Sequence, residues 1–279
     1  MDFMFRKLAA AVLLGLSLVA TLASAQVVKD QDEIALDQKL KRVYELYRVG
    51  ETVTLRPHEF RIGVGVDYSF DETERLGIRT RTRAVGTNAT IGFGVSKWLE
   101  VQLVLPMQGI FSRIDNFGTD VRHRDVIGFG GMGLQFTAVL PTKVMETALT
   151  FGVTLPSGDR RLGANHMQSL LGLNVAKQLR PAFIYGGISW GHDWDATRDS
   201  IGYIGGVGFY LNHALSLGGE LSGQSFIQSI PHGNQDIFST SFRLAYQATP
   251  DFGINASFSH GLTVGAPNIT INLNVVRRF

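Results

Sequence analysis

Residues 60–70 read FRIGVGVDYSF, and their strict alternation decides the fold. Even-numbered positions hold Phe, Ile, Val, Val, Tyr and Phe, whereas odd-numbered positions hold Arg, Gly, Gly, Asp and Ser. Successive side chains of a β-strand point to opposite faces, so one face of this strand is apolar and the other is polar or bare. The stretch therefore predicts a strand that separates two different solvents.

The same alternation recurs to the end of the chain and predicts twelve strands. Their approximate cores are residues 60–70, 85–95, 99–105, 132–140, 147–155, 167–175, 184–190, 203–211, 215–221, 238–246, 252–258 and 269–279. Tight turns are expected at 96–97, 141–145, 177–181, 212–213 and 249–251, and long loops at 71–83, 106–125, 156–165, 191–200, 226–236 and 261–267. An even strand number with alternating short and long connections is typical of bacterial outer-membrane barrels, whose short turns are periplasmic.

Composition agrees with a membrane protein that has no membrane helix. The 279 residues have a mean hydropathy of +0.09, yet after about residue 25 no apolar run approaches the ~20 residues that a membrane helix needs. The absence of Cys excludes a disulfide framework and a thiolate site. A net charge of +2 with scattered basic residues gives no sign of a nucleic-acid partner.

A soluble β-sandwich or lipocalin-like barrel would also alternate. Three features favour the membrane barrel: a polar face of Gly, Ser, Thr and Asn, the regular alternation of loop lengths, and a chain that ends in Phe. Aromatic residues near strand ends are expected to form interface girdles. They are Tyr68, Phe70, Trp98, Phe183, Tyr185, Trp190, Trp194, Phe252 and Phe258. The predicted fold class is all-β: a 12-stranded antiparallel transmembrane β-barrel over residues 58–279, preceded by a short periplasmic helix.

The N-terminal part carries a secretory signal. Arg6 and Lys7 precede an apolar stretch at 8–22, and the small residues 23–25 read ASA. This predicts a signal peptide over residues 1–25, the alternative being an N-terminal membrane anchor. Residues 26–57 then form an amphipathic helical segment in the periplasm that packs on the barrel, self-associates or plugs the pore. Its apolar stripe consists of Leu36, Leu40, Val43 and Tyr47.

Two stretches resemble known families. Residues 272–279, NLNVVRRF, resemble the C-terminal strand by which Gram-negative barrels are recognised for insertion, and Phe279 would be the signal read by the assembly machinery. Residues 149–159, LTFGVTLPSGD, resemble the strand-loop motif of the phenol meta-pathway or transporter-like outer-membrane family. A helix before a twelve-stranded barrel is also similar to the functional-amyloid secretion channel. That similarity implies a homotrimer whose helix plugs the lumen and which secretes a fibre subunit or processed peptide.

Charged side chains on the polar face are candidates for the lumen. They are Arg61, Asp67, Glu100, Glu146, Glu220, Arg243 and Arg278. Rings of charge set selectivity in many pores, so these residues would anchor the plug or select the substrate, or else pair along the wall and stiffen it. Arg79, Arg81 and Arg83 recur at every second position in a predicted loop. Arg suits phosphate, so we expect contact with outer-leaflet lipopolysaccharide, the alternatives being a basic external vestibule that selects anions and a solvated loop face.

No catalytic, cofactor or metal site is predicted. Twelve strands are also the number in the outer-membrane phospholipase, but His166 and Ser169 fall on opposite faces, so a hydrolase requires cross-strand partners. The 192–195 stretch, HDWD, lacks further ligands at metal-binding spacing. The Gly-rich runs at 128–133 and 202–208 are not phosphate loops and mark a bend or the close approach of another element.

We therefore expect a non-enzymatic outer-membrane channel that is gated or plugged by its N-terminal helix and passes a substrate across the membrane, either by diffusion or as one part of a system that secretes an amyloid, a fibre or a processed peptide. The alternatives are an uptake channel for hydrophobic or aromatic small molecules, a phospholipase-like hydrolase, and a closed structural barrel.

Overall fold

The computed structural model describes residues 54–75, 78–116, 120–142, 144–162, 165–179, 181–195, 198–227 and 236–279. The expected signal peptide and the helix with Leu36, Leu40, Val43 and Tyr47 lie outside these ranges, so both stay predictions, as do the domain limits at residues 25 and 57. Among the described residues, no helix is long and apolar enough to cross a membrane.

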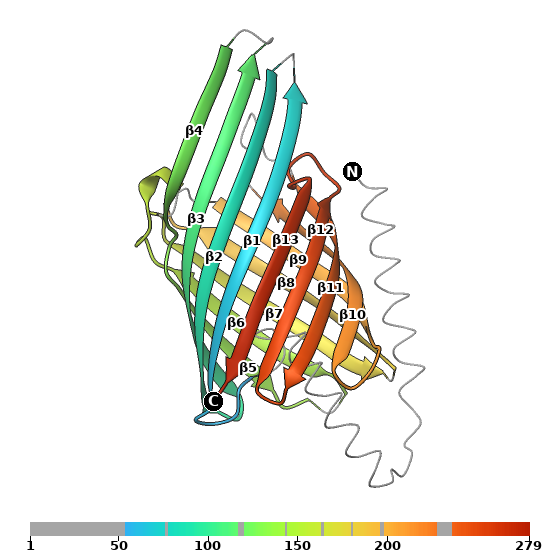
Figure 1. Ribbon diagram of the computed structural model, residues 1–279. Coiled ribbons are helices and arrows are strands. Elements are labelled where there is room, and N and C mark those ends of the chain that lie inside the picture. The colour runs from blue at the N-terminus through green and yellow to red at the C-terminus, as the bar shows by residue number, and fades with distance from the viewer. Residues whose placement is uncertain are drawn as a thin grey trace, which may run out of the picture. The chain divides into compact units, whose positions relative to one another are not determined.

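Thirteen strand segments make up a single sheet (Figure 1). They are β1 (Phe60–Arg75), β2 (Ile78–Ser96), β3 (Leu99–Asn116), β4 (Asp120–Phe129), β5 (Gly133–Leu140), β6 (Glu146–Thr154), β7 (Gln168–Leu179), β8 (Ala182–Asp193), β9 (Arg198–Tyr210), β10 (Leu215–Phe226), β11 (Ile237–Thr249), β12 (Phe252–Gly261) and β13 (Ile269–Arg278). One short 3₁₀ helix, η2 (Arg160–Leu162), lies between β6 and β7.

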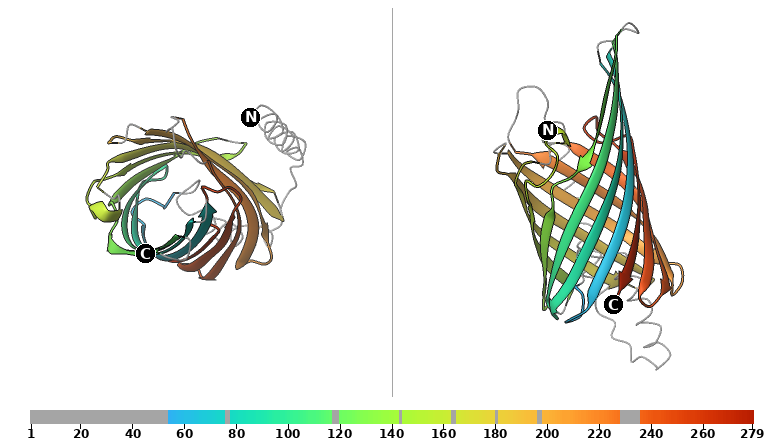
Figure 2. Two further views of the ribbon diagram at one scale, coloured as in Figure 1. Left: turned by 90° about the horizontal axis from the view of Figure 1, so that it is seen from above. Right: turned by 60° about the vertical axis from the view of Figure 1, so that its left-hand side comes forward.

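The sheet closes into a barrel of twelve strands, which confirms the predicted fold (Figure 2). Every neighbouring pair is antiparallel, and β1 joins both β2 and β13. Segments β4 and β5 pair with the upper and lower parts of β3, so they occupy one position in the wall. The break between them lies opposite Pro106, which has no N–H for the ladder, and its Cγ would be 2.7 Å from a Cβ on Gly130.

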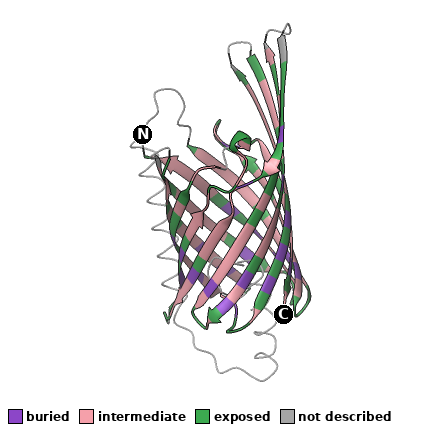
Figure 3. Cartoon of the chain, turned by 90° about the vertical axis from the view of Figure 1, so that its left-hand side faces the viewer, coloured by how far each residue is buried: buried purple, intermediate pink, exposed green. Residues whose placement is uncertain are grey.

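The two faces of the wall differ as the alternation requires. Outward apolar side chains are open to the surroundings, with Val64 53% and Ile188 55% exposed. An exposed apolar band around a closed barrel is suited to lipid. Buried residues instead gather toward the end of the barrel where the C-terminus lies (Figure 3). By the rule that short turns are periplasmic, this filled end faces the periplasm.

Two stretches that were expected to be long loops are instead extended hairpins, so those two loop predictions were wrong. Strands β1 and β2 continue their pairing up to Arg75 and Ile78, and β3 and β4 continue up to Asn116 and Asp120. The physical reason is that the RTRTR stretch itself has strand periodicity. Its arginines also face partners across the ladder, because Glu72 accepts hydrogen bonds from both Arg79 and Arg81.

The last residue joins the first strand. The amide of Phe279 donates to the carbonyl of Phe60 at 2.8 Å, and the amide of Phe60 donates back at 3.1 Å. The Phe279 ring is 61% exposed on the outer face, and the Arg277 guanidinium lies 4.9 Å from its centroid. Its role as an assembly signal stays a prediction.

Candidate functional site

A buried ion pair lies in the lumen near its periplasmic end. Arg61 of β1 and Glu100 of β3 are joined across β2, and their side chains are 3% and 2% exposed. The same guanidinium donates to Gln102 Oε1 at 3.1 Å. Burial of a charged pair is costly unless its remaining hydrogen-bonding positions are filled, and here they are filled by neighbours in the wall and by the incoming chain.

The incoming chain folds back into the lumen through a tight turn at residues 56–59. The Glu59 amide donates to the Arg56 carbonyl at 3.0 Å, and the Glu59 side chain accepts from the Arg56 amide at 2.9 Å. Pro57 occupies the second position, and His58 takes a φ of 65° in the third. This is the arrangement of a type II turn, which reverses the chain between Leu55 and the start of β1.

Leu55 is held inside the barrel by Glu100. Its amide donates to Glu100 Oε2 at 2.9 Å, and the residue is only 4% exposed. The inner face of β2 is bare where the segment crosses it: a Cβ on Gly94 would be 2.0 Å from the Arg56 carbonyl oxygen, and one on Gly92 would be 3.3 Å from Leu55. These two glycines allow the backbone of residues 55–56 to lie directly against the wall. We call residues 54–59 the inner segment.

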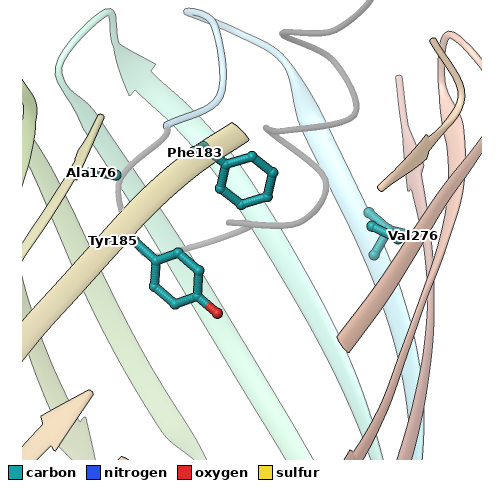
Figure 4. Close-up of a cluster of buried hydrophobic side chains, with 5 residues drawn as sticks. Ala176, Phe183, Tyr185 and Val276 are labelled. Atoms are coloured by element: carbon teal, nitrogen blue, oxygen red, sulfur yellow. The ribbon is translucent and has the colours of Figure 1, made fainter. Parts of the chain in front are cut away.

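Aromatic side chains fill the opposite side of the same end (Figure 4). Phe183 is fully buried and Tyr185 is 6% exposed, and both project inward from β8. Their placement in an outer girdle was therefore wrong, because the register with β7 places them on the inner face. A Cβ on Gly208 would be 2.1 Å from the Phe183 ring, and one on Gly206 would be 2.5 Å from the Tyr185 ring. The Gly-rich run of β9 thus accommodates aromatic rings of the neighbouring strand.

A second carboxylate with an arginine stands on this side. Glu220 of β10 accepts hydrogen bonds from the Tyr185 hydroxyl and from Arg243 Nη1, each at 3.0 Å. The Tyr210 ring lies 5.2 Å from the Phe183 ring, and its hydroxyl donates to Gln178 at 3.4 Å. The periplasmic end of the lumen is therefore lined by two charge-balanced clusters, one against the inner segment and one beside the aromatic rings.

The side chains of the other predicted lumen residues also lie on the inner face of the wall, but their neighbours differ. Asp67 lies across the bare inner face of Gly86. Glu146 accepts a hydrogen bond from Gln178 at 3.3 Å. Arg278 is opposite Arg61 in the β1–β13 register. The structure brings the seven residues to one face of the wall without joining them into one ring, and their part in selectivity stays a prediction.

The arginines predicted to contact lipopolysaccharide stand on the outer face of the extended β1–β2 hairpin. Arg79 and Arg81 share Glu72, with Arg81 Nε 3.2 Å from its carboxylate. Arg83 is opposite Phe70 and Phe111, at the upper limit of the apolar band. Among the described residues no ion pair involves Arg83, so it is the arginine of the three best suited to a phosphate headgroup.

Cross-strand register does bring a serine, a histidine and an aspartate together on the outer wall. Ser169, His192 and Asp199 are successive partners on β7, β8 and β9, and His192 Nδ1 is 2.7 Å from Asp199. Ser169 instead accepts a hydrogen bond from Trp194 Nε1 at 3.3 Å, and no described bond joins it to His192. The serine thus lacks the contact with a base that a hydrolase nucleophile needs. His166, the other candidate, lies 3.2 Å from Asp195.

Sequence spacing missed one group of three potential metal ligands. Atoms of His166, Asp193 and Asp195 lie within 4.8 Å of one another at the extracellular end of β7 and β8. Exposed carboxylates often gather in this way without an ion, so we assign no metal here. The inner segment was also missed, although its signals were present as Pro57 before the first strand and glycines on the inner face of β2.

Comparison with known proteins places the chain in a family. Residues 99–279 match the family described as putative MetA-pathway of phenol degradation. The chain belongs to this family. No curated protein matches it.

The chain is similar to several solved outer-membrane proteins, and the first of them shows the fold. The COG4313 outer membrane channel from Pseudomonas putida F1 superposes with a TM-score of 0.67 at 15% identity, covering 82% of this chain and 98% of that one. The KdgM porin gives 0.49 at 9% identity, covering 77% and 99%. The CymD monoaromatic hydrocarbon channel gives 0.45 at 8%, covering 80% and 88%. Because this chain is a closed barrel with an exposed apolar band, we identify it as an outer-membrane β-barrel.

Proposed function

We propose that this protein is an outer-membrane channel through which a small molecule diffuses, and that its N-terminal segment restricts the periplasmic mouth. The observation that carries the proposal is the path of the inner segment. The backbone of Leu55 and Arg56 lies against the inner face of β2 at Gly92 and Gly94, and Leu55 is buried in the lumen, where Glu100 holds its amide. A chain that enters the barrel at this point reduces the cross-section open to solute.

For the substrate we propose small uncharged aromatic compounds entering the cell. The family description names phenol degradation, which supports uptake over secretion. The ring of Tyr210 is only half-buried and packs against the buried ring of Phe183, so it presents an aromatic face and a hydroxyl group at the periplasmic end, which suits a solute ring carrying a polar substituent. Gating by the expected helix over residues 32–48 extends this proposal, because that helix would lead directly into the inner segment.

Other expectations stay predictions. They comprise secretion of a fibre subunit or processed peptide, the homotrimer, lipopolysaccharide contact through Arg83, recognition of Phe279 by the assembly machinery, and the hydrolase. The hydrolase predicts ester turnover in detergent that is lost in the Ser169→Ala variant, and no such turnover is expected from a channel.

The channel is tested by single-channel recording in planar bilayers with three proteins. They are the full chain, a variant lacking residues 27–53 and a variant lacking residues 27–56. We expect a low conductance for the full chain and a clear rise when residues 54–56 are also removed. The 27–53 deletion is the matched control, because it keeps Leu55 and its bond to Glu100. Equal conductance of all three would contradict restriction by the segment, and no conductance from any of them would contradict the channel.

A further inference from the structure

One part of the lumen wall is a pocket in which six of the eleven lining residues carry a hydroxyl group. It has a volume of about 230 Å³, and its sides come from β10, β11, β12 and β13. The hydroxyl-bearing residues that line it are Ser222, Ser239, Ser241, Ser257, Ser259 and Thr270. Its volume is below that of typical drug-sized ligand sites, so it suits one small solute.

These hydroxyls are paired with one another across the strands. Ser222 Oγ lies 3.1 Å from Ser239 Oγ, and Ser241 Oγ lies 2.8 Å from Ser259 Oγ. A hydroxyl both donates and accepts, and it rotates to suit its partner. The pairs can therefore be exchanged for bonds to a solute without leaving a buried polar atom unsatisfied.

The loop between β12 and β13 covers one side of the pocket with Ala266 and Pro267. It folds over the inner face at Gly261, where a Cβ would be only 2.4 Å from the Pro267 carbonyl oxygen and 2.9 Å from the Ala266 side chain. Ala266 is 2% exposed. The loop is fixed by Thr263, whose hydroxyl donates to the Asp236 carbonyl at 2.6 Å and accepts from the Phe238 amide at 3.0 Å. Ala266 and Pro267 are thus held in place over the pocket, and we call them its roof.

The floor of the pocket is charged but balanced. Arg243 Nη1 donates to Glu220 Oε2 at 3.0 Å, and the Tyr185 hydroxyl donates to the same oxygen. Because the guanidinium and the carboxylate neutralise each other, the floor presents no net charge that would attract an anionic or a cationic solute. An apolar solute would remove water from the serine hydroxyls without replacing their hydrogen bonds, which is costly.

We propose that this pocket is a binding subsite for a small neutral solute that carries several hydroxyl groups. Its hydroxyls would replace the serine pairs while the roof and the Glu220–Arg243 floor set its depth. The proposal rests on the channel function but goes beyond the aromatic substrate proposed above, because it adds a polar binding site for a second class of solute.

Binding is tested with the full chain in detergent by saturation-transfer NMR titration. The probes are D-ribose and D-ribonate, which have the same carbon number but differ in charge. Because each lost hydrogen bond weakens binding, the Ser241→Ala/Ser259→Ala variant should bind ribose about ten-fold more weakly. Ser189→Ala on the facing wall is the matched control and should bind ribose as the wild type does. Ribose should also bind more tightly than ribonate.

Unchanged ribose affinity in the double variant, equal affinity for ribonate, or no ribose binding by the wild type would each overturn the subsite. The readout does not depend on transport. A barrel that conducts but does not bind ribose would overturn only the subsite. A barrel that binds ribose and shows no conductance even after deletion of residues 27–56 would support the subsite and overturn the channel.

Discussion

Two arginine–carboxylate pairs, one at each end of the barrel, differ chiefly in their surroundings. Arg61 and Glu100 at the periplasmic end are 3% and 2% exposed, whereas Arg161 and Asp159 in the extracellular loop after β6 are 66% and 24% exposed. The exposed pair is well formed, with Arg161 Nη2 2.7 Å from Asp159. Water competes for the second pair and is excluded from the first. The same two functional groups therefore fix a chain segment at one end and only order a loop at the other.

The largest effect is expected when the buried pair is broken. Glu100→Gln leaves the Arg61 guanidinium buried without its counter-charge, which should lower the free energy of unfolding by about 3 kcal/mol or more. Urea unfolding from lipid vesicles measures this. Glu146→Gln is the control, because Glu146 also begins a strand after a periplasmic turn but is bonded to the amide of Gln178.

A double variant that removes both charges tests whether the unpaired Arg61 charge causes the loss of stability. In Arg61→Met/Glu100→Met no charge is left buried, so most of the lost stability should return. If the double variant is as unstable as Glu100→Gln, the loss comes from packing and not from the unpaired charge.

A somewhat smaller effect should follow a methyl group at Gly94. The Gly94→Ala Cβ would be 2.0 Å from the Arg56 carbonyl oxygen, so the inner segment must move at a cost of about 1–3 kcal/mol. Conductance in planar bilayers should rise at the same time. Gly172→Ala serves as the control, because its Cβ would meet neighbours only at 3.7 Å. Equal conductance of the two variants would contradict a segment held against β2.

The turn that directs the segment inward should respond to backbone chemistry. His58 has a φ of 65°, a conformation that β-branched residues adopt poorly. His58→Val should therefore destabilise the barrel by about 1–2 kcal/mol, whereas His58→Gly should not. Thermal unfolding of the two variants separates them, and an equal loss in both would point to the imidazole instead.

The smallest effect belongs to the exposed pair. Hydrogen bonds from the Arg161 side chain and amide hold the pKa of Asp159 below its ordinary value. Because the folded pKa is depressed, the stabilisation is present above the ordinary pKa and is lost as the pH falls through the folded value. NMR titration of Asp159 in the wild type and in Arg161→Gln should show a higher pKa in the variant. An unchanged pKa would mean that the pair does not form in solution.

Sequence periodicity predicted the barrel well, but it predicted poorly which side chains and which chain segment lie inside the barrel. Alternation such as that of residues 60–70 reports which face meets lipid, so the strand number and the facing of Arg61 and Glu100 could be inferred. Alternation does not tell which residues of neighbouring strands lie opposite one another. Only this register shows that Arg61 reaches Glu100 across β2. Phe183 was misplaced for the same reason, since an aromatic residue near a strand end fits an outer girdle or a lumen equally well.

The inner segment depends on contacts that no local pattern encodes. Leu55 and Glu100 are 45 positions apart, and their bond requires three strands to be aligned. The bare glycines of β2 could indicate a close approach, but the glycine runs singled out at 128–133 and 202–208 were longer and more conspicuous. They instead adjoin Asp159, Pro106 and the rings of β8.

The pairing of the first strand, β1, with the last strand, β13, has a consequence for how the barrel is assembled. The ring becomes continuous only when β13 pairs with β1, and this pairing joins the two strands that are farthest apart in the sequence. The turn at residues 56–59 and its contacts with Gly94 and Glu100 need only β1, β2 and β3, which are adjacent in the chain. The inner segment can therefore be in place on a three-stranded sheet before the ring exists. The remaining strands would then close around a segment that is already in place, and residues 54–59 need not be threaded into a finished barrel.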